Sequence, residues 1–211
     1  MAITNGYCTL DELKGYLDQG GQVTLGSGND TEMEAAVTAA SRMIDGHCNR
    51  RFYDDGEVSA RVYAAEHPAI VKVDDFSTTS GLVIATDTTG TGTFDRTWAA
   101  ADYQVEPLNG VVEGIAGWPY WRIRSIDTET FPVARQARVQ VTARWGWATV
   151  PAAIKQACLI QAAYIWRRKD AITGILGATD FGSVTVRAGL DRDAELLLAP
   201  YRRGDIVVPV G

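Results

Sequence analysis

The chain has 211 residues, of which 46% are hydrophobic and 22% are charged, and its formal net charge is −6. This composition is typical of a globular protein that buries a sizeable core, either as one large domain or as one domain with a substantial insertion. The acidic balance disfavours sequence-specific nucleic-acid binding, because such binding needs a broad basic surface for the phosphates. No run approaches the roughly 18 apolar residues that span a bilayer, and the N-terminal residues lack a signal-peptide pattern, so we expect synthesis and retention in a cytoplasm.

Charge is distributed unevenly along the chain. Residues 1–56 hold 4 Lys/Arg and 9 Asp/Glu, residues 57–148 hold 8 and 11, and residues 149–211 hold 8 and 6, which gives net charges of −5, −3 and +2. The same three segments are the predicted organisation: an N-terminal helical part (1–56), a β-rich insertion (57–148) and a C-terminal part (149–211) whose helix, mobile loop and tail complete a helical bundle.

The N-terminal part carries two helix starts. Thr9 and Glu12 have the spacing of a capping box, which predicts a short helix that ends near Leu17. A second cap is expected at Asp30 or Thr31. From Glu32 onward, apolar or small residues recur every three or four positions, which predicts a longer helix with one buried face: Met33, Ala36, Val37, Ala40, Ile44 and Cys48.

The middle of the chain changes to short β-type runs separated by turn residues. In the last run, Val139, Val141 and Ala143 alternate with polar residues, as in a strand with one solvent-facing side. The pattern predicts a small antiparallel sheet unit. Its candidate strands are Val58 to Ala64, Ile70 to Val73, Leu82 to Thr86, Tyr103 to Glu106, Trp121 to Ile126 and Ala137 to Trp145.

The C-terminal part begins after Trp145-Gly146-Trp147, where Pro151 favours the first turn of a third helix that runs to about Lys169. This helix has one mostly apolar stripe, which we expect to be buried: Ile154, Ala157, Cys158, Gln161, Ala162, Ile165 and Trp166. Further elements are expected in the order of a glycine-punctuated apolar loop, a strand, a short helix and a β-prone tail: Thr173 to Gly182, Val184 to Arg187, Arg192 to Leu198, and Ile206 to Val210. The predicted fold class is therefore α+β: a small helical bundle of three main helices with an antiparallel β-sheet insertion between the second and third.

Residues that carry catalysis or hold metals are sparse. The two histidines are His47 and His67, and Cys48 cannot share a zinc site with His47 because neighbouring helical residues point about 100° apart. Three cysteines, odd in number and far apart in sequence, argue against a disulfide framework and fit buried apolar side chains; Cys158 lies on the buried stripe of its helix. We expect no catalytic residue, metal or cofactor.

Several apolar segments have two interpretations. The tail is either an edge strand of the protein's own sheet or a strand that adds to a neighbouring subunit or partner protein by β-augmentation. The aromatic residues Trp118, Tyr120 and Trp121 are either core or interface anchors. Together with Arg122 they also support an alternative function, a small ligand-binding or hydrolase domain whose site lies in the β insertion, provided that a deep pocket exists there.

The order of these segments resembles a known family, the head-to-tail connector proteins of tailed phages, which are head completion or adaptor proteins that bind beneath the portal ring. The resemblance is carried by five stretches in order: Tyr7 to Leu17, Ile44 to Phe52 with its Cys-Asn-Arg-Arg-Phe ending, Trp145 to Ala157, Trp166 to Asp170, and Leu198 to Arg203.

This resemblance implies a structural virion protein at the head-to-tail interface, without catalytic residues. It implies a homo-oligomeric ring, commonly a dodecamer, between the portal protein and the next tail component, with DNA passing through its lumen without sequence-specific binding. An acidic wall suits that role, because like charges keep the duplex from adhering. The candidate partner or subunit contacts are Trp166, Arg167, Arg168, Lys169, Ile175, Leu176, Phe181, Ile206, Val207, Val208 and Val210.

Overall fold

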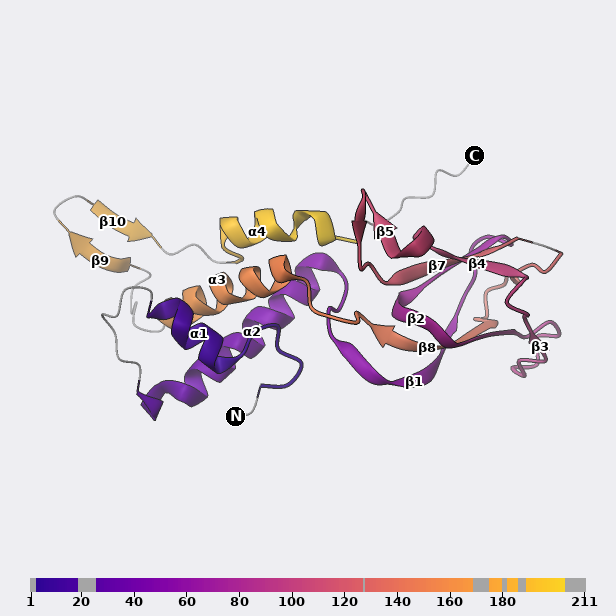
Figure 1. Ribbon diagram of the computed structural model, residues 1–211, viewed down its shortest axis with the longest axis horizontal. Helices are drawn as coiled ribbons and strands as arrows, with labels where there is room; N and C mark the ends of the chain where they lie inside the picture. The colour runs from indigo at the N-terminus through magenta and orange to yellow at the C-terminus, as the bar shows by residue number, and fades with distance from the viewer. Residues whose placement is uncertain are drawn as a thin grey trace. The chain divides into compact units, whose positions relative to one another are not determined.

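A computed structural model describes residues 3–18, 26–126, 128–168, 175–179, 182–185 and 189–203. Its fold class is α+β, as predicted, with four α-helices and a mostly antiparallel set of strands among the described residues (Figure 1). The chain forms two compact units: Met1–Phe52 together with Val150–Gly211, called here the helical unit, and Tyr53–Thr149, called the sheet unit.

The first helix of the helical unit, α1 (Leu10–Leu17), begins as predicted. The Thr9 side chain accepts a hydrogen bond from the Glu12 N–H, and the Glu12 carboxylate accepts one from the Thr9 N–H. This reciprocal pair satisfies donors that have no partner within the helix. Glu12 also forms an ion pair with Lys155 on α3, so the same carboxylate caps α1 and joins it to a neighbouring helix.

The second helix, α2 (Asp30–Cys48), starts differently from the prediction. A 3-10 turn, η1 (Ser27–Asn29), leads directly into it, and its N-cap is Asn29, which makes no side-chain capping bond. Asp30 instead pairs with Lys14 of α1 at 2.5 Å. The prediction of a cap at Asp30 or Thr31 was wrong because both residues already lie within the helix, the Asp30 N–H donates to the Ser27 carbonyl of the preceding turn, and the Asp30 carboxylate pairs with Lys14.

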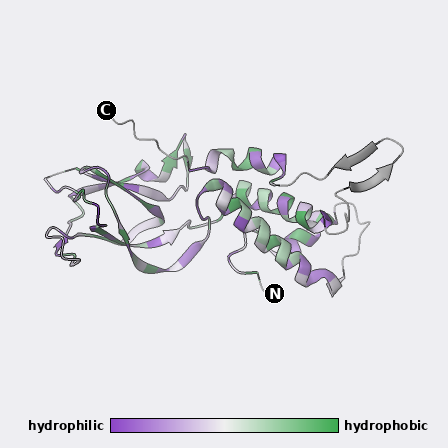
Figure 2. Cartoon of the chain, turned by 180° about the vertical axis from the view of Figure 1, so that it is seen from behind, coloured by the Kyte–Doolittle hydropathy of each residue, from purple (hydrophilic) through white to green (hydrophobic). Residues whose placement is uncertain are grey.

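The third helix, α3 (Ala152–Arg168), contacts α1, α2 and α4 (Arg192–Leu198). Pro151 immediately precedes α3, and its carbonyl accepts a hydrogen bond from the Lys155 N–H at 3.0 Å. Apolar residues run along α2 and α3 (Figure 2). The side chains buried in this unit include Leu13, Met33, Val37, Ala40, Ile44, Ile154, Ala157, Cys158, Ala162 and Leu198. The buried stripe predicted for α2 is therefore confirmed, and that of α3 is confirmed as far as Ala162, whereas Ile165 and Trp166 are half-buried.

One buried polar residue ties α3 to α4. Gln161, fully buried, donates to the Gly189 carbonyl at 3.2 Å and accepts from the Asp191 N–H at 2.8 Å. Asp191 is the N-cap of α4, since its side chain accepts from the Asp193 N–H. The predicted stripe of α3 included Gln161, and the structure shows that its amide completes the backbone hydrogen bonding just before α4.

The sheet unit holds a six-stranded antiparallel sheet of order β1-β8-β2-β7-β4, with β3 paired to β2. Four of its strands lie close to predicted segments: β1 (Asp54–Tyr63), β4 (Tyr103–Glu106), β7 (Tyr120–Ser125) and β8 (Val139–Gly146). Along β8 the valine and alanine side chains are buried, which confirms the predicted alternation.

The predicted strands Ile70 to Val73 and Leu82 to Thr86 are one strand, β2 (Ile70–Thr86). Its first part pairs with β7 and its second part with β8, and register shifts lie between Thr78 and Val83. The separation into two strands was wrong because the polar Ser/Thr/Gly stretch that reads as a turn is an irregularity within a continuous strand. The two-residue strands β3 (Arg96–Thr97), β5 (Val111–Val112) and β6 (Ile115–Ala116) were not predicted.

The core of the sheet unit is aromatic and β-branched. Trp145 lies between Phe76, at a ring distance of 6.2 Å, and Tyr63, at 5.9 Å, while Trp98 stacks on Phe131 at 4.4 Å. The other buried members are Ala65, Val71, Val73, Ile84, Ile123, Val139, Val141 and Ala143.

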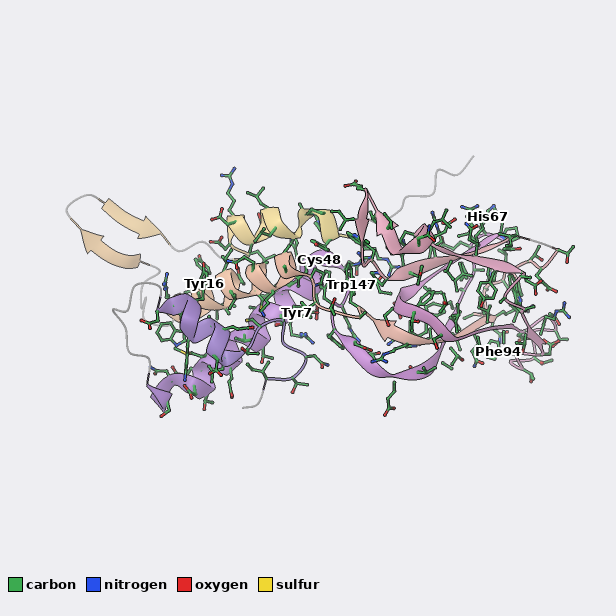
Figure 3. The ribbon with its side chains drawn as sticks, viewed as in Figure 1. Tyr7, Tyr16, Cys48, His67, Phe94 and Trp147 are labelled. Atoms are coloured by element: carbon green, nitrogen blue, oxygen red, sulfur yellow. The ribbon has the colours of Figure 1, made fainter. Side chains whose placement is uncertain are left out.

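Gly146 occupies a position that only glycine fits. Its φ is +100°, and a Cβ there would lie 1.9 Å from the carbonyl oxygen of Tyr53. The glycine of the Trp-Gly-Trp motif thus allows the end of β8 to approach the backbone that leads into β1. Trp147 then turns to donate its indole N–H to the Asp75 carboxylate at 3.2 Å, and its side chain is labelled in Figure 3.

The segment Thr173 to Gly182 contains a strand, so its prediction as a loop was wrong. β9 (Ile175–Thr179) pairs antiparallel with β10 (Gly182–Thr185), which overlaps the start of the predicted strand Val184 to Arg187. The glycines hid the β tendency of this stretch, because an antiparallel partner a few residues later outweighs them. The short helix α4 has the predicted bounds, whereas the tail Ile206 to Val210 lies outside the described residues.

Candidate interaction surfaces

The end of α3 presents two cations, as the sequence predicted. Arg167 and Arg168 are exposed in its last turn, and Trp166 before them is half-buried. Cations at this position complement the partial negative charge of the helix C-terminus. Exposed guanidinium groups also pair well with carboxylates in a bidentate geometry, so this helix end is suited to an acidic partner surface.

The other predicted contact residues are placed only in part. Ile175 and Leu176 lie in β9, the first strand of the hairpin that follows α3 in the chain (Figure 1). The remaining six lie outside the described residues: Lys169, Phe181, Ile206, Val207, Val208 and Val210.

A second surface, which the sequence did not reveal, is an exposed apolar side of the sheet. Val58, Ala60 and Val62 of β1 lie opposite Arg144, Thr142 and Gln140 of β8, and Val83 of β2 is also opposite Thr142. Directly opposed residues point to the same side of a sheet. These four apolar residues therefore share the solvent side, and we call them the valine face; the exposed fractions of its three valines are 45–51%.

The orientation of β1 explains the valine face. Arg61 and Tyr63, which alternate with the valines, point to the buried side. The Arg61 guanidinium lies 4.5 Å from the Trp145 ring centroid and pairs with Asp55 at 2.6 Å and Asp74 at 2.7 Å. A shielded cation over an indole ring gains cation–π attraction, and the two carboxylates neutralise its charge. The strand thus directs its polar residues inward and its valines outward.

A third exposed apolar group lies at the hairpin formed by β5 and β6. Leu108, Val111 and Ile115 have exposed fractions of 56%, 38% and 59%. Leu108 lies just before Asn109, which has a positive φ of 57°, and Val111 and Ile115 belong to different pairs of the hairpin, opposite Ala116 and Val112. Single exposed apolar side chains are common on protein surfaces, so these three do not by themselves define a contact site.

The aromatic group that motivated a ligand site is used in packing. Trp118 is buried and contacts Trp121 at a ring distance of 6.0 Å and Trp147 at 5.2 Å. Tyr120 packs on Phe76 at 5.4 Å. Of the two interpretations of these aromatics, core or interface anchor, the structure places Trp118 in the core.

Arg122, the cation of that same group, is also engaged. It forms an ion pair with Glu106, which pairs with Arg124 at 2.8 Å as well. Burial raises the pKa of the Glu106 carboxyl, but the two arginines outweigh burial and hold the pKa below its usual range. Glu106 is therefore a carboxylate at neutral pH, and Arg122 serves a cross-strand ion pair between β4 and β7.

Within the described ranges, no group of three or more His, Cys, Asp and Glu side chains is arranged to hold a metal ion. In that same part of the chain, none of the helices combines the length and the apolar character needed to cross a membrane.

Comparison with known proteins identifies the fold. No protein-family model matches the chain, and no curated protein matches it. Solved structures do. The neck of an empty gene transfer agent particle, computed with C6 symmetry, contains a chain that is 15% identical with a TM-score of 0.58, and the match covers 99% of this chain and 95% of that one.

A chain in the virion of the native gene transfer agent particle is 17% identical, again with a TM-score of 0.58 and the same coverage of 99% and 95%. The neck of the native particle, computed with C12 symmetry, gives 16% identity and a TM-score of 0.49. The two matches with a TM-score of 0.58 show that this chain has the fold of a neck component of a phage-like particle over nearly its whole length, in agreement with the resemblance to head-to-tail connectors.

Proposed function

We propose that this protein is a structural, non-enzymatic neck component: a head-to-tail connector or adaptor that forms a ring beneath the portal, extends the DNA channel and provides the docking surface for the tail. The observation that carries the proposal is the match to neck and virion chains over 99% of this chain and 95% of the other. A match over both lengths means that the helical and sheet units occur together in the same order in those particle components.

The structure supports a role without catalysis. The side chains that suggested a ligand site are used in aromatic packing and in the Arg122–Glu106 ion pair. The exposed features of the described residues are instead apolar groups and a cationic helix end, which are features of contact surfaces. Nothing in that part of the chain favours the ligand-binding alternative.

We infer a homo-oligomeric ring, a dodecamer in the particle. The gene transfer agent neck with C6 symmetry supports a closed ring for this chain, and the number of twelve copies rests on the resemblance to head-to-tail connectors. A closed ring needs two different contact patches on each copy, because the contacts are head to tail. The proposed patches comprise the end of α3 with Trp166, Arg167 and Arg168, the β9–β10 hairpin, and the tail Ile206 to Val210, which adds as a strand to a neighbouring subunit or to the portal.

The proposal also assigns roles to the parts of the chain. The three longer helices form one bundle into which the sheet is inserted, with functional boundaries at residues 1–56, 57–148 and 149–211. The acidic first two segments, with net charges of −5 and −3, face the lumen and the exterior of the ring. A wall of that sign lowers the adhesion of DNA during its passage.

The test is assembly with the purified portal protein of the same particle, measured as mass against concentration. We expect a monomer or small oligomer alone and a ring on the portal. The double variant Arg167→Glu, Arg168→Glu is expected to weaken portal binding at least tenfold. Its matched control is Arg135→Glu, an exposed charge reversal in the sheet unit. A wild-type chain that never joins the portal would refute the function.

Deletion of residues 204–211 tests the tail separately. We expect the shortened chain to fold normally and to fail in assembly, so that particles lose DNA. If the shortened chain assembles and particles retain their DNA, the proposed β-augmentation by the tail is wrong. That outcome does not bear on the proposed ring.

A further inference from the structure

Two thiols that are 150 positions apart meet inside the helical unit. Cys8 lies in the segment before α1, Cys158 lies in the middle of α3, and their Sγ atoms are 3.3 Å apart. Both residues are buried and reduced, with exposed fractions of 4% and 0%. A disulfide needs an S–S distance of about 2.05 Å, so the sulfurs would have to approach by only about 1.3 Å.

The surroundings favour one protonation arrangement of this pair. The Ser41 Oγ lies 3.5 Å from the Cys158 Sγ and accepts the Tyr7 N–H at 3.1 Å. The hydrogen bond from the Cys8 thiol is the main cause that lowers the pKa of Cys158; burial opposes it, and Ser41 and the backbone N–H groups of residues 7 and 8 add to it. The same shared proton, followed by burial, raises the pKa of Cys8. Of the two thiols, Cys158 is therefore the one whose ionisation the surroundings favour.

The third thiol, that of Cys48, is too far from Cys158 to form a disulfide with it. Cys48 is the last residue of α2, seven positions after Ser41, which touches Cys158. At a rise of about 1.5 Å per residue, Cys48 lies about 10 Å along the helix from that contact. This exceeds the reach of a disulfide, so Cys48 provides an internal control (Figure 3 labels Cys48 together with Tyr7, the neighbour of Cys8).

We propose that Cys8 and Cys158 are a latent disulfide that closes within one chain when the protein meets a low-molecular-weight disulfide such as oxidised glutathione. The bond would fasten the segment before α1 to α3. This inference depends on the contact between the two sulfurs and is independent of the proposed function.

The chemistry is an ordinary double exchange. The Cys158 thiolate attacks one sulfur of the small disulfide, forms a mixed disulfide and expels one small thiolate, which takes up the proton of Cys8. The Cys8 thiolate then attacks the Cys158 sulfur and expels the second small thiolate, which takes up from water the proton that Cys158 released when it ionised. The two protein thiols lose two electrons and two protons, and the small disulfide is reduced to two thiols.

Burial makes access the slow step. Neither thiol is open to a reagent in the folded protein, so the segment before α1 has to detach first. Its opening has to break the Tyr7 N–H to Ser41 bond, the hydrogen bonds of the Tyr7 hydroxyl with Asp45 and with the Phe52 N–H, and the bond from Arg42 to the Asn5 carbonyl. Local opening of one segment costs less than global unfolding. Reducing cytoplasm keeps the pair open, and oxidising surroundings close it.

The test treats the full chain with excess oxidised glutathione, in buffer and in urea below the unfolding midpoint, followed by acid quenching, denaturation and alkylation with N-ethylmaleimide. Intact mass should show the loss of two hydrogens and one alkylated thiol instead of three. Proteolysis should release a peptide pair that joins Cys8 to Cys158. The oxidised chain should unfold at a temperature several degrees higher, because the bond constrains a very long loop.

Variants make the result specific. Cys48→Ser should still close the bond and leave no alkylated thiol, whereas Cys8→Ser and Cys158→Ser should leave two reactive thiols or their glutathione adducts. The proposal is overturned if three thiols are alkylated after oxidation under both conditions. It is equally overturned if the linked peptides contain Cys48, or if Cys8 and Cys158 both carry glutathione in the same molecule.

Discussion

Replacement of Gly146 by alanine should lower the stability of the sheet unit far more than the addition of one methyl group usually does. The glycine has a φ of +100°, and the added Cβ would lie 1.9 Å from the Tyr53 carbonyl oxygen, 2.9 Å from its carbonyl carbon and 3.1 Å from the Asp54 Cα. All three neighbours are backbone atoms, so no side-chain rotation relieves the clash. The chain entering β1 has to move away from the end of β8.

The magnitude follows from three effects. A non-glycine residue at this positive φ costs about 1–2 kcal/mol. Displacement of Tyr53 breaks the hydrogen bond from the Trp147 N–H to the Tyr53 carbonyl, 3.4 Å long in the native fold, at a cost of about 1 kcal/mol. The Asp54–Gly146 pairing that opens β1 is also lost. We expect the unfolding free energy to fall by about 3–5 kcal/mol.

Gly56→Ala is the matched control. Gly56 also has a positive φ, +80°, but nothing lies within 4 Å of the position of its Cβ. Its replacement should therefore show the conformational strain alone, about 1–2 kcal/mol. The difference between the two variants, about 2 kcal/mol or more, isolates the close backbone approach at Gly146.

Urea unfolding followed by tryptophan fluorescence suits this comparison, because five of the six tryptophans lie in the sheet unit and only Trp166 lies in the helical unit. With a slope of about 2 kcal/mol per molar urea, the midpoint of Gly146→Ala should lie about 1 M below that of Gly56→Ala. Equal midpoints for the two variants would refute the role assigned to the backbone contact.

Three further predictions concern the helical unit. Gln161→Leu leaves the Gly189 carbonyl and the Asp191 N–H without their partner, so α4 should lose about 1–3 kcal/mol of stability, seen as faster amide exchange across 192–198; unchanged exchange would contradict the link. Thr9→Ala removes the cap of α1 and should cost about 1 kcal/mol in chemical unfolding, while Thr9→Ser should retain most of it. The pKa of the Glu12 carboxyl is lowered chiefly by its lysine partner on α3 and then by the Thr9 N–H. The contribution of Glu12 to the free energy of unfolding is therefore complete above the unfolded pKa of about 4.3 and is lost as pH falls through the folded pKa. Wild-type stability should drop more than that of Glu12→Gln between pH 5 and 3, and parallel curves would show that Glu12 contributes nothing.

Features set by neighbouring residues were predictable. The capping box at Thr9 and Glu12, the helix start after Pro151 and the alternation of Val139, Val141 and Ala143 each depend on residues within one turn or one strand. Their energies are local, because a cap, a fixed φ and a two-residue period need no knowledge of distant parts of the chain.

Features that depend on residues far apart in the sequence could not be predicted from it. The Asp30 carboxylate is taken by Lys14, and this pairing depends on how α1 lies against α2. The strand β2 is continuous because β7 and β8 support its two parts, although its middle reads as a turn. The three short strands are too brief for any periodicity to indicate them.

The sequence by itself determined that the chain is an α+β protein whose helical segments come before and after a β-rich middle, because those patterns arise from local propensity and periodicity. Only the tertiary structure decided which side of β1 is exposed to solvent and which two thiols are in contact. Arg61 lies on the buried side of β1, where it contacts the Trp145 ring and pairs with two carboxylates. Val58 and Val62 therefore face solvent, which reverses the usual pattern of apolar residues inside and polar residues outside. The contact between Cys8 and Cys158 spans 150 positions, and it exists because α3 packs against both the N-terminal segment and α2.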